Sequence, residues 1–419
     1  MLAGSDLGRS EWRNGWPVLV ASAIGCGMVA THAITLGSFV VPLTHEFGWT
    51  RAQITAGLSF GSLGTIFLSP LLGRLLDWTG ARRVALVGVP LYAIALALLG
   101  LVEPSILSWY GAWACLAILS MGMSPVIWTL AVASRFERNR GFALALVLAG
   151  LSLASAVMPL VAVTAIEAWG WRAAYWSLSA LALILVWPLT FAFFYDRSDL
   201  ARSGQPHEQG NAPPLTMQAS GFSVRQALSR RQFWQIVVAL TLVGGCYNAI
   251  YQHFQPMLID AGLDALGAAA IAGIIGPISF ASRLLTGFLL DRVPAPFVAA
   301  PAFALPIVTC ILLSGFDGSS TTAMIAIACT AMAAGAEVDL IAFLAARYFG
   351  MRSYGAIYGL IFSAHTIGWA IMPIVAGITF GRSGNYDSIL FFMVGMLALS
   401  ATLAATLGRY PALPVTRDG

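Results

Sequence analysis

Long runs of apolar residues, separated by short polar stretches, make up most of the chain. A helix that crosses the hydrocarbon core of a bilayer needs about 20 consecutive, mostly apolar residues. Twelve stretches of the sequence meet this requirement. They predict membrane-spanning helices near residues 17–41, 53–76, 83–102, 108–134, 141–166, 172–195, 232–259, 266–290, 296–316, 320–346, 354–380 and 387–408. The pattern therefore predicts an all-α polytopic membrane protein.

One long polar segment, residues 196–231, separates the sixth and seventh apolar stretches. Its Pro, Gly, Gln and charged residues are typical of a linker. Its last part, SVRQALSRRQFW, predicts a short helix that lies on the membrane surface. We therefore expect a six-helix half at residues 1–195, a cytoplasmic linker with a surface helix at 196–231, and a second six-helix half at 232–419.

Composition supports the membrane assignment and argues against several kinds of partner. The 419 residues are 58% hydrophobic and 10% charged, whereas soluble proteins are typically about 25% charged. The net charge of +4 is spread thinly, which argues against nucleic acid as a partner. The five cysteines lack the spacing of a metal site or a disulfide framework. We expect no cofactor and no metal, a lipid bilayer as the surroundings, and a monomer.

The positions of the arginines predict the orientation of the chain. All 22 basic residues are arginines. When the N-terminus is placed in the cytoplasm, 18 of them fall in cytoplasmic segments and three on the opposite side, at Arg51, Arg172 and Arg382. Because cytoplasmic loops are enriched in basic residues, we expect a multi-pass protein of the cytoplasmic (inner) membrane with both termini in the cytoplasm. The remaining arginine, Arg283, lies inside an apolar run.

An internal repeat relates the two halves. A shift of 214 residues lays residues 42–77 on residues 256–291 without a gap, with eight of 36 positions identical. The same shift lays Arg138 on Arg352 and Asp77 on Asp291. A duplicated six-helix unit is a transporter architecture whose substrate site lies near the bilayer midplane.

The stretch GRLLDWTGARR, residues 73–83, resembles the loop between helices 2 and 3 of the major facilitator superfamily, and GFLLDR, residues 287–292, is a shorter copy. The resemblance implies the major facilitator fold, with twelve transmembrane helices in two pseudo-symmetric halves. Further stretches resemble the bacterial monocarboxylate-transporter-like and oxalate/formate-antiporter-like branch. These are GSFVVPLTHEFGWTRAQI (37–54), RFERNRGFALAL (135–146), GWRAAYW (170–176), SRLLTGFLLDR (282–292) and GAEVDLIAFLAARYFGMRSYGAIYG (335–359).

The chain departs from this branch at the positions linked to proton coupling. Monocarboxylate carriers commonly have an Asp four residues before the arginine of helix 8, where this chain has Ser279. The lysines that the branch carries in helix 1 or helix 11 are absent, since the chain has no lysine. We therefore leave proton coupling and anion exchange open as driving forces.

Three charged residues lie inside predicted spans: Arg283, Glu337 and Asp339. The repeat places no charge at the equivalent positions of the first half, where Ser69 corresponds to Arg283. An intramembrane charge is by default a candidate functional residue. A guanidinium holds a carboxylate through two parallel hydrogen bonds, and the resemblance implies the same role for the arginine of helix 8. We favour this carboxylate clamp; the alternative is an internal ion pair with Glu337 or Asp339.

Glu337, Asp339 and His32 are the candidate proton-coupling residues. The two acids are two positions apart, so on a helix they point in directions about 200° apart and cannot both face one cavity. An equally favoured alternative pairs both acids with loop arginines such as Arg135, Arg138 or Arg347. His365, near the middle of its span, is a candidate second cation for an anionic substrate. The candidate substrate-binding residues are Arg283, His365, Tyr247, Tyr251, Asn248, Trp128 and Ser69.

The candidate gating residues follow from the resemblance. In the superfamily the acid of the loop motif, here Asp77, packs near the start of helix 11 and stabilises the state closed to the cytoplasm. A helix N-terminus favours an anion. The alternative is that the arginines only mark the cytoplasmic side. The full set of candidates is Asp77, Arg82, Arg83, Arg138, Asp291, Arg292 and Arg352.

The sequence as a whole predicts a secondary active transporter that moves a small organic anion by alternating access. The first alternative is a multidrug or metabolite efflux carrier, but the fifth span, GFALALVLAGLSLASAVMPLVAV, lacks the G-P-x-x-G-G signature of drug exporters. An enzyme is not expected, because the sequence has neither HExxH nor a cluster of ligands with metal-site spacing. A sensor is a weaker alternative, because only about ten residues follow the last predicted span.

Overall fold

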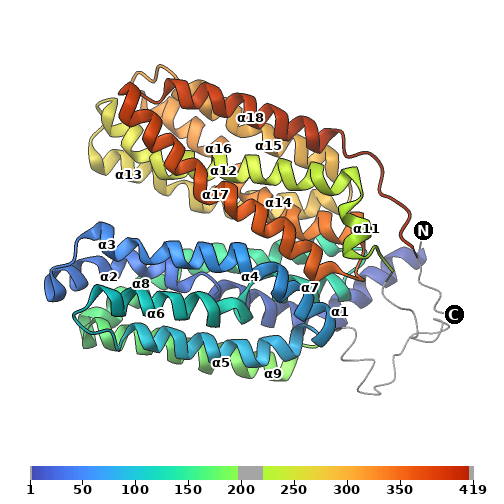
Figure 1. The fold of residues 1–419 in the computed structure, drawn as a ribbon. Coiled ribbons are helices and arrows are strands. Elements are labelled where there is room, and N and C mark those ends of the chain that lie inside the picture. The colour runs from blue at the N-terminus through green and yellow to red at the C-terminus, as the bar shows by residue number, and fades with distance from the viewer. Residues whose placement is uncertain (1, 197–219, 415–419) are drawn as a thin grey trace. The chain divides into compact units, whose positions relative to one another are not determined.

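The computed structural model describes residues 2–196 and 220–414, which form helices joined by short connections and contain no strand (Figure 1). The helices that precede the undescribed segment are α1 (Leu2–Met28), α2 (Thr31–Phe47), α3 (Arg51–Thr55), α4 (Gly57–Thr79), α5 (Ala81–Leu99), α6 (Ile106–Leu119), η1 (Ser120–Met123), α7 (Pro125–Arg135), α8 (Arg140–Leu181), η2 (Ala182–Val186) and α9 (Trp187–Phe193). Those that follow it are α11 (Val224–Leu228), α12 (Arg231–Asp260), α13 (Ala265–Gly273), α14 (Ile275–Leu290), α15 (Ala295–Leu313), α16 (Ser320–Leu344), η3 (Ala345–Phe349), α17 (Tyr354–Ser383) and α18 (Asp387–Ala405).

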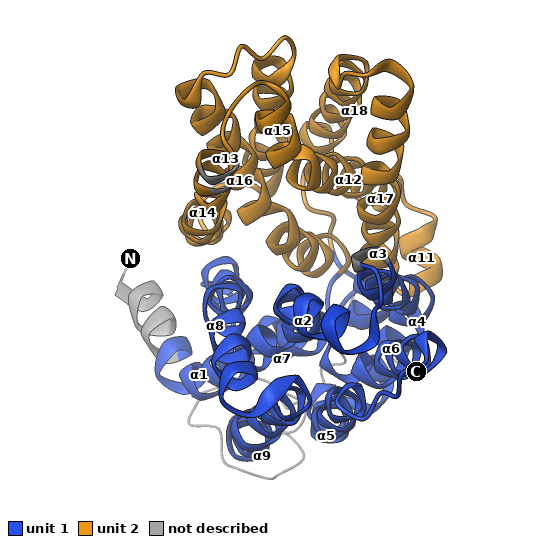
Figure 2. Ribbon diagram, turned by 90° about the vertical axis from the view of Figure 1, so that its left-hand side faces the viewer, with its two compact units in different colours: residues 1–221, 350–359, 413–419 blue, residues 222–349, 360–412 orange. Residues whose placement is uncertain are grey.

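The helices form two compact units (Figure 2). Unit 1 contains α1 to α9 together with residues 350–359, and unit 2 contains α11 to α16 and residues 360–412. Residues 350–359, which the sequence assigns to the second half, thus group with unit 1. The reason is a close approach of the start of α17 to α4. A Cβ atom on Gly359 would lie 2.5 Å from the carbonyl oxygen of Ser69, so glycine permits this contact.

The number of membrane-crossing segments agrees with the sequence prediction. Length and composition qualify eleven helical segments of the described residues as membrane spans. One of them, Arg140–Phe193, has 54 residues, far more than one crossing requires. Helix α8 is broken inside this segment at Gly170, where φ is 81° and ψ is 165°. The segment therefore holds two predicted spans, 141–166 and 172–195, and each of the twelve predicted crossings falls on helix.

Four predicted spans are interrupted in the structure, which corrects their prediction as single helices. The span predicted at 53–76 divides at Ala56, between α3 and α4. The span predicted at 17–41 is divided between α1 and α2. The span at 108–134 breaks at Ser124, whose ψ of 145° is extended, because the following proline disfavours the helical conformation there. The span at 266–290 divides at Ile274, which lies between Gly273 and Gly276, and glycine weakens a helix by about 1 kcal/mol relative to alanine.

Most of the predicted linker, residues 197–219, lies outside the described residues. The helix predicted at its end is present as α11. Ser223 caps it by accepting a hydrogen bond from the backbone N–H of Gln226, whose side chain in turn accepts from the backbone N–H of Ser223. This reciprocal capping box explains why a helix of five residues begins there.

The surface of the described helices is apolar, as contact with lipid requires. Large apolar side chains such as Phe67, Leu71, Ile184, Phe297 and Ile374 are more than half exposed. Contiguous exposed apolar surface of this kind marks contact with a membrane or a partner. Three charged residues, Arg283, Glu337 and Asp339, are instead buried inside unit 2, where they form part of the candidate site.

Candidate functional site

Four ionisable side chains are buried together in unit 2: Arg283 on α14, Glu337 and Asp339 on α16, and His365 on α17. Their exposed fractions are 6%, 2%, 1% and 5%. A charge buried at membrane depth is costly unless it has a partner of opposite charge or a strong hydrogen bond. Their partners therefore determine what this cluster can do.

Arg283 forms an ion pair with Asp339, through Nη1 and Oδ1. The alternative that the sequence left open for Arg283, an internal ion pair, is thus present in the structure. The pair does not use all of either group. The Nε of Arg283 and the Oδ2 of Asp339 are buried and have no hydrogen-bond partner among the described residues. The guanidinium therefore keeps an N–H donor with which it can bind a second anion.

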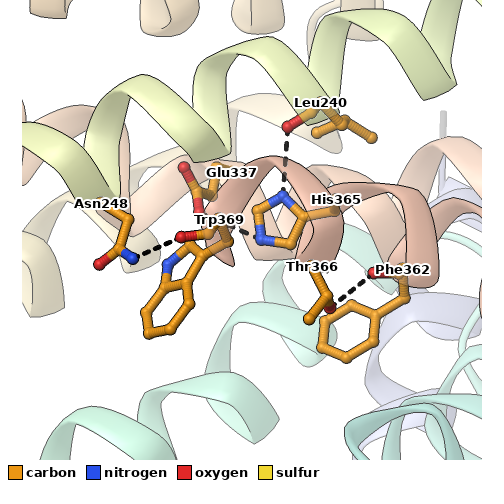
Figure 3. A network of polar contacts seen from close by, with 7 residues as sticks. All are labelled: Leu240, Asn248, Glu337, Phe362, His365, Thr366 and Trp369. Atoms are coloured by element: carbon orange, nitrogen blue, oxygen red, sulfur yellow. Dashed lines mark hydrogen bonds and ion pairs between the residues drawn. The ribbon is translucent and has the colours of Figure 1, made fainter. Parts of the chain in front are cut away.

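Glu337 lies beside His365, with Nε2 of the imidazole 3.4 Å from Oε1 of the carboxyl group. The other ring nitrogen, Nδ1, is 3.2 Å from the backbone carbonyl oxygen of Leu240 on α12 (Figure 3). The imidazole thus lies between an acid on α16 and a carbonyl on α12. The Oε2 of Glu337 is buried and has no hydrogen-bond partner among the described residues.

The two acids of α16 contact different helices, as their spacing requires. Asp339 pairs with α14, and Glu337 lies against α17. The alternative in which both acids pair with the loop arginines Arg135, Arg138 or Arg347 is therefore wrong. Pairing with partners at membrane depth avoids leaving either buried carboxyl group without compensation.

Two glycines permit these contacts. A Cβ atom on Gly335 of α16 would overlap the carbonyl oxygen of Ser279 and would lie 2.8 Å from the backbone nitrogen of Arg283 on α14. A Cβ atom on Gly244 of α12 would overlap the imidazole ring of His365. Glycine at these positions lets α14 approach α16 and lets the ring of His365 lie against α12.

The remaining polar candidates of unit 2 lie on α12. Asn248 is buried and donates a hydrogen bond of 2.6 Å to the backbone oxygen of Trp369 (Figure 3). Tyr247 and Tyr251 stack with their ring centroids 6.0 Å apart, and Tyr251 is half exposed. Tyr247 interacts electrostatically with both Glu337 and Arg283. The structure therefore brings Tyr247 to the charged cluster and binds Asn248 to α17.

The candidates of the first half all lie in unit 1. Trp128 is fully buried, its indole N–H donates to the backbone oxygen of Met123, and its ring packs on Phe194. These contacts pack Trp128 inside unit 1, and a substrate-binding role for it stays a prediction. Ser69 is buried, and its hydroxyl has no hydrogen-bond partner among the described residues. His32 lies on α2 with Nδ1 3.2 Å from the hydroxyl of Tyr92.

Comparison with known proteins identifies the family. The model of the Major Facilitator Superfamily matches residues 19–373. This chain belongs to the major facilitator superfamily. Within the described residues, no group of three or more His, Cys, Asp or Glu side chains could hold a metal ion. The match to the family model and the eleven membrane-spanning segments of the described residues make this chain a multi-pass transporter of the superfamily.

Relatives and solved structures agree with this assignment. Human monocarboxylate transporter 11 is 26% identical, over 93% of this chain and 81% of its own length. The chloramphenicol resistance protein of Streptomyces lividans is 25% identical, over 93% of this chain and 95% of its own. The crystal structure of the E. coli fucose:proton symporter has a TM-score of 0.70 at 17% identity, over 94% of this chain and 98% of its own. The last similarity shows the fold.

The loop motif of the superfamily places its acid at the start of α17. Asp77, on α4, accepts hydrogen bonds from the backbone N–H groups of Gly355 at 2.8 Å and Ala356 at 3.0 Å. These N–H groups belong to the first turn of α17, which has no intrahelical partners for them. The carboxyl group thus caps the helix at its positive end. A gating role for Asp77 stays a prediction.

Arg82 of the same motif caps the C-terminal end of a different helix, α9. Its guanidinium donates to the backbone oxygens of Thr190, Phe191 and Phe194 at the end of α9, and it lies 3.6 Å from the ring centroid of Tyr195. A cation at a helix C-terminus is favourable. In the second half, Arg292, which follows the end of α14, donates to the backbone oxygen of Phe288 in that helix. Asp291 follows the last residue of α14. The other candidates, Arg83, Arg138 and Arg352, are exposed.

Reasoning from the sequence missed three contributors to the site: Leu240, Gly244 and Gly335. Leu240 contributes a backbone oxygen, and every residue has such an oxygen, so its sequence carries no signal for this role. The two glycines lie in apolar spans that contain many other glycines. Helical spacing from the singled-out residues would have pointed to Gly335, since it lies on α16 two and four positions before the two acids.

Proposed function

We propose that this major facilitator protein is a secondary active transporter that moves a small organic anion with a carboxylate group across the cytoplasmic membrane. Transport would proceed by alternating access, with both termini in the cytoplasm as the arginine distribution predicts. A curated relative is named as a monocarboxylate transporter, which supports a carboxylate as the substrate.

The observation that carries this proposal is the state of Arg283. It is buried at membrane depth, it pairs with Asp339 through one nitrogen, and its Nε remains without a partner among the described residues. The internal pair stabilises the guanidinium when no substrate is present. A substrate carboxylate can bind the remaining N–H or replace Asp339, because a guanidinium binds carboxylates through two parallel hydrogen bonds. The clamp and the ion pair are thus two states of one arginine.

Two pairs of residues complete the proposed site. His365 and Glu337 supply the second ionisable pair. Tyr247, which interacts electrostatically with Arg283, stacks on Tyr251, and the two rings offer apolar surface for the carbon skeleton of the substrate. This arrangement favours a small acid with an apolar or aromatic body.

Exchange in reconstituted vesicles tests the proposal. Vesicles loaded with unlabelled pyruvate, lactate, oxalate or benzoate are diluted into the same acid in labelled form, and uptake is followed. We expect rapid exchange of at least one acid by the wild type and a loss of at least tenfold in Arg283→Gln. The matched control is Arg382→Gln, which removes an exposed arginine at the end of α17 and should exchange at the wild-type rate. Equal exchange by Arg283→Gln and wild type would contradict the clamp.

The second candidate function is efflux of drugs or metabolites. It is favoured by the relative from Streptomyces lividans, which is named as a chloramphenicol resistance protein. Chloramphenicol has no carboxylate, so this function would not need the second binding capacity of Arg283. Cells that express the wild type should then tolerate more chloramphenicol than cells that express no carrier, and Arg283→Gln should protect equally well.

A further inference from the structure

The hydrogen bond from His365 to Leu240 fixes where one proton lies. A backbone carbonyl oxygen can only accept, so Nδ1 of His365 must carry the hydrogen of this contact. In a neutral imidazole the other nitrogen, Nε2, then has a lone pair and no hydrogen. This nitrogen is the one that lies 3.4 Å from Oε1 of Glu337.

An unprotonated Nε2 in contact with an ionised carboxylate is unfavourable, because both groups are hydrogen-bond acceptors and repel each other. The contact is favourable only when a proton lies on one of the two groups. The pair is then either a neutral imidazole with a carboxylic acid or an imidazolium with a carboxylate, and in both forms its net charge is zero. The geometry of α12, α16 and α17 thus requires one proton between His365 and Glu337.

The surroundings contain the other groups that bear on this proton. From α14, Arg283 faces Glu337, and its charge is balanced by Asp339 on α16. From α12, the neutral side chains of Cys246 and Tyr247 lie near Glu337. From α15, the neutral thiol of Cys310 lies near that of Cys246. Without substrate, therefore, the ion pair and the His–Glu pair together carry no net charge.

A substrate anion disturbs this balance. Its addition gives the buried cluster a net charge of −1, which is costly at membrane depth. A second proton on the His–Glu pair would restore neutrality. The structure offers a place for it, because Oε2 of Glu337 is buried and has no hydrogen-bond partner among the described residues.

We infer that His365 and Glu337 form the proton-binding site of the carrier, which holds one proton without substrate and binds a second proton together with the anion. This inference rests on the proposed function. The second proton makes the pair an imidazolium beside a carboxylic acid, with a charge of +1 that offsets the charge of the anion. One proton and one monovalent anion are taken up from one side and released on the other, so transport is electroneutral.

Nitrogen NMR of the full-length protein tests the proton between the two groups without any substrate. The chain has five histidines, so ¹⁵N-histidine labelling gives few signals, and His365→Asn identifies those of His365. We expect Nδ1 to be protonated, and we expect the signal of Nε2 to shift in Glu337→Gln, because an amide then replaces either the acid O–H or the carboxylate as the partner of this nitrogen. Glu46→Gln, which changes an acid on α2 in unit 1, is the matched control and should leave the signals of His365 unchanged. An unprotonated Nδ1, or no response to Glu337→Gln, would overturn the inference.

Transport of labelled pyruvate tests the second proton. In Glu337→Gln we expect exchange between equal pools at both sides to persist, because it needs no net proton movement. Accumulation driven by an imposed pH gradient should fall at least tenfold, and in the wild type an imposed membrane potential should leave it unchanged. Normal accumulation by Glu337→Gln, or accumulation by the wild type that follows the potential, would overturn the inference.

The two arms separate this inference from the proposed function. If the wild type exchanges none of pyruvate, lactate, oxalate and benzoate, the proposed function is contradicted, whereas the NMR signals of His365 still decide whether the pair holds a proton. If exchange occurs and the NMR signals of His365 do not respond to Glu337→Gln, the proposed function is supported and the inference about the proton site is overturned.

Discussion

Arg283 and Asp339, 56 positions apart in the chain, meet inside unit 2 through an ion pair that buries both side chains. Each partner makes the other tolerable at membrane depth, because an uncompensated buried charge is strongly destabilising. Neither partner is saturated, since Nε of Arg283 and Oδ2 of Asp339 have no hydrogen-bond partner among the described residues. A pair of this kind is stable without substrate and still open to a competing anion.

Removal of the charge of one partner should therefore lower the free energy of unfolding more than removal of both charges. We expect Asp339→Asn to lower the free energy of unfolding by about 3–5 kcal/mol, because it leaves the guanidinium without a counter-charge. Arg283→Gln should have a similar effect, and the double variant should be more stable than the sum of the two predicts. Unfolding of the four proteins in the same detergent measures this coupling. Strictly additive losses would show that the pair contributes nothing.

The close contact of α14 and α16 should depend on Gly335. We expect Gly335→Ala to destabilise the protein by about 1–3 kcal/mol, because the added Cβ overlaps backbone and side-chain atoms of α14. Thermal unfolding measures the effect. The matched control is Gly276→Ala on α14, where a Cβ would meet nothing within 4 Å, so the substitution should be neutral or stabilise by up to about 1 kcal/mol. Equal behaviour of the two variants would contradict the close contact.

The cap that Asp77 provides at α17 should combine charge and hydrogen bonding. We expect Asp77→Asn to lower stability by about 0.3–2 kcal/mol, because the amide keeps one acceptor oxygen and loses the favourable charge at the helix N-terminus. Asp77→Ala should cost more, since it leaves the N–H groups of Gly355 and Ala356 without this acceptor. Melting temperatures in detergent give the order. Equal melting temperatures of both variants and the wild type would show that the cap does not contribute to stability.

The features of the fold that the sequence predicts are those with a local signal. Hydropathy places the twelve crossings, and the break at Ser124 follows from the proline after it. The division between α1 and α2 has no such signal, since neither Val29 nor Ala30 is a helix breaker.

The sequence identifies the ionisable residues of the site but does not show which of them pair with each other. Arg283, Glu337, Asp339 and His365 stand out because each is ionisable inside an apolar span. Which acid pairs with which base depends on how four helices pack, and no local pattern encodes that. For Trp128 the sequence gives no such signal, because an aromatic residue in a span looks the same whether it packs or binds, and in the structure it is fully buried.

Ligand-induced stabilisation of the purified protein tests the central claim, that Arg283 binds a substrate carboxylate. Melting temperatures of the wild type, Arg283→Gln and Arg382→Gln are measured with and without each acid of the carboxylate panel. A ligand that binds only the folded state raises stability by about 2.7 kcal/mol when present at 100 times its Kd. We predict that one acid raises the melting temperature of the wild type and of Arg382→Gln and leaves Arg283→Gln unchanged. An equal rise in all three proteins would contradict the claim and place the carboxylate at another group.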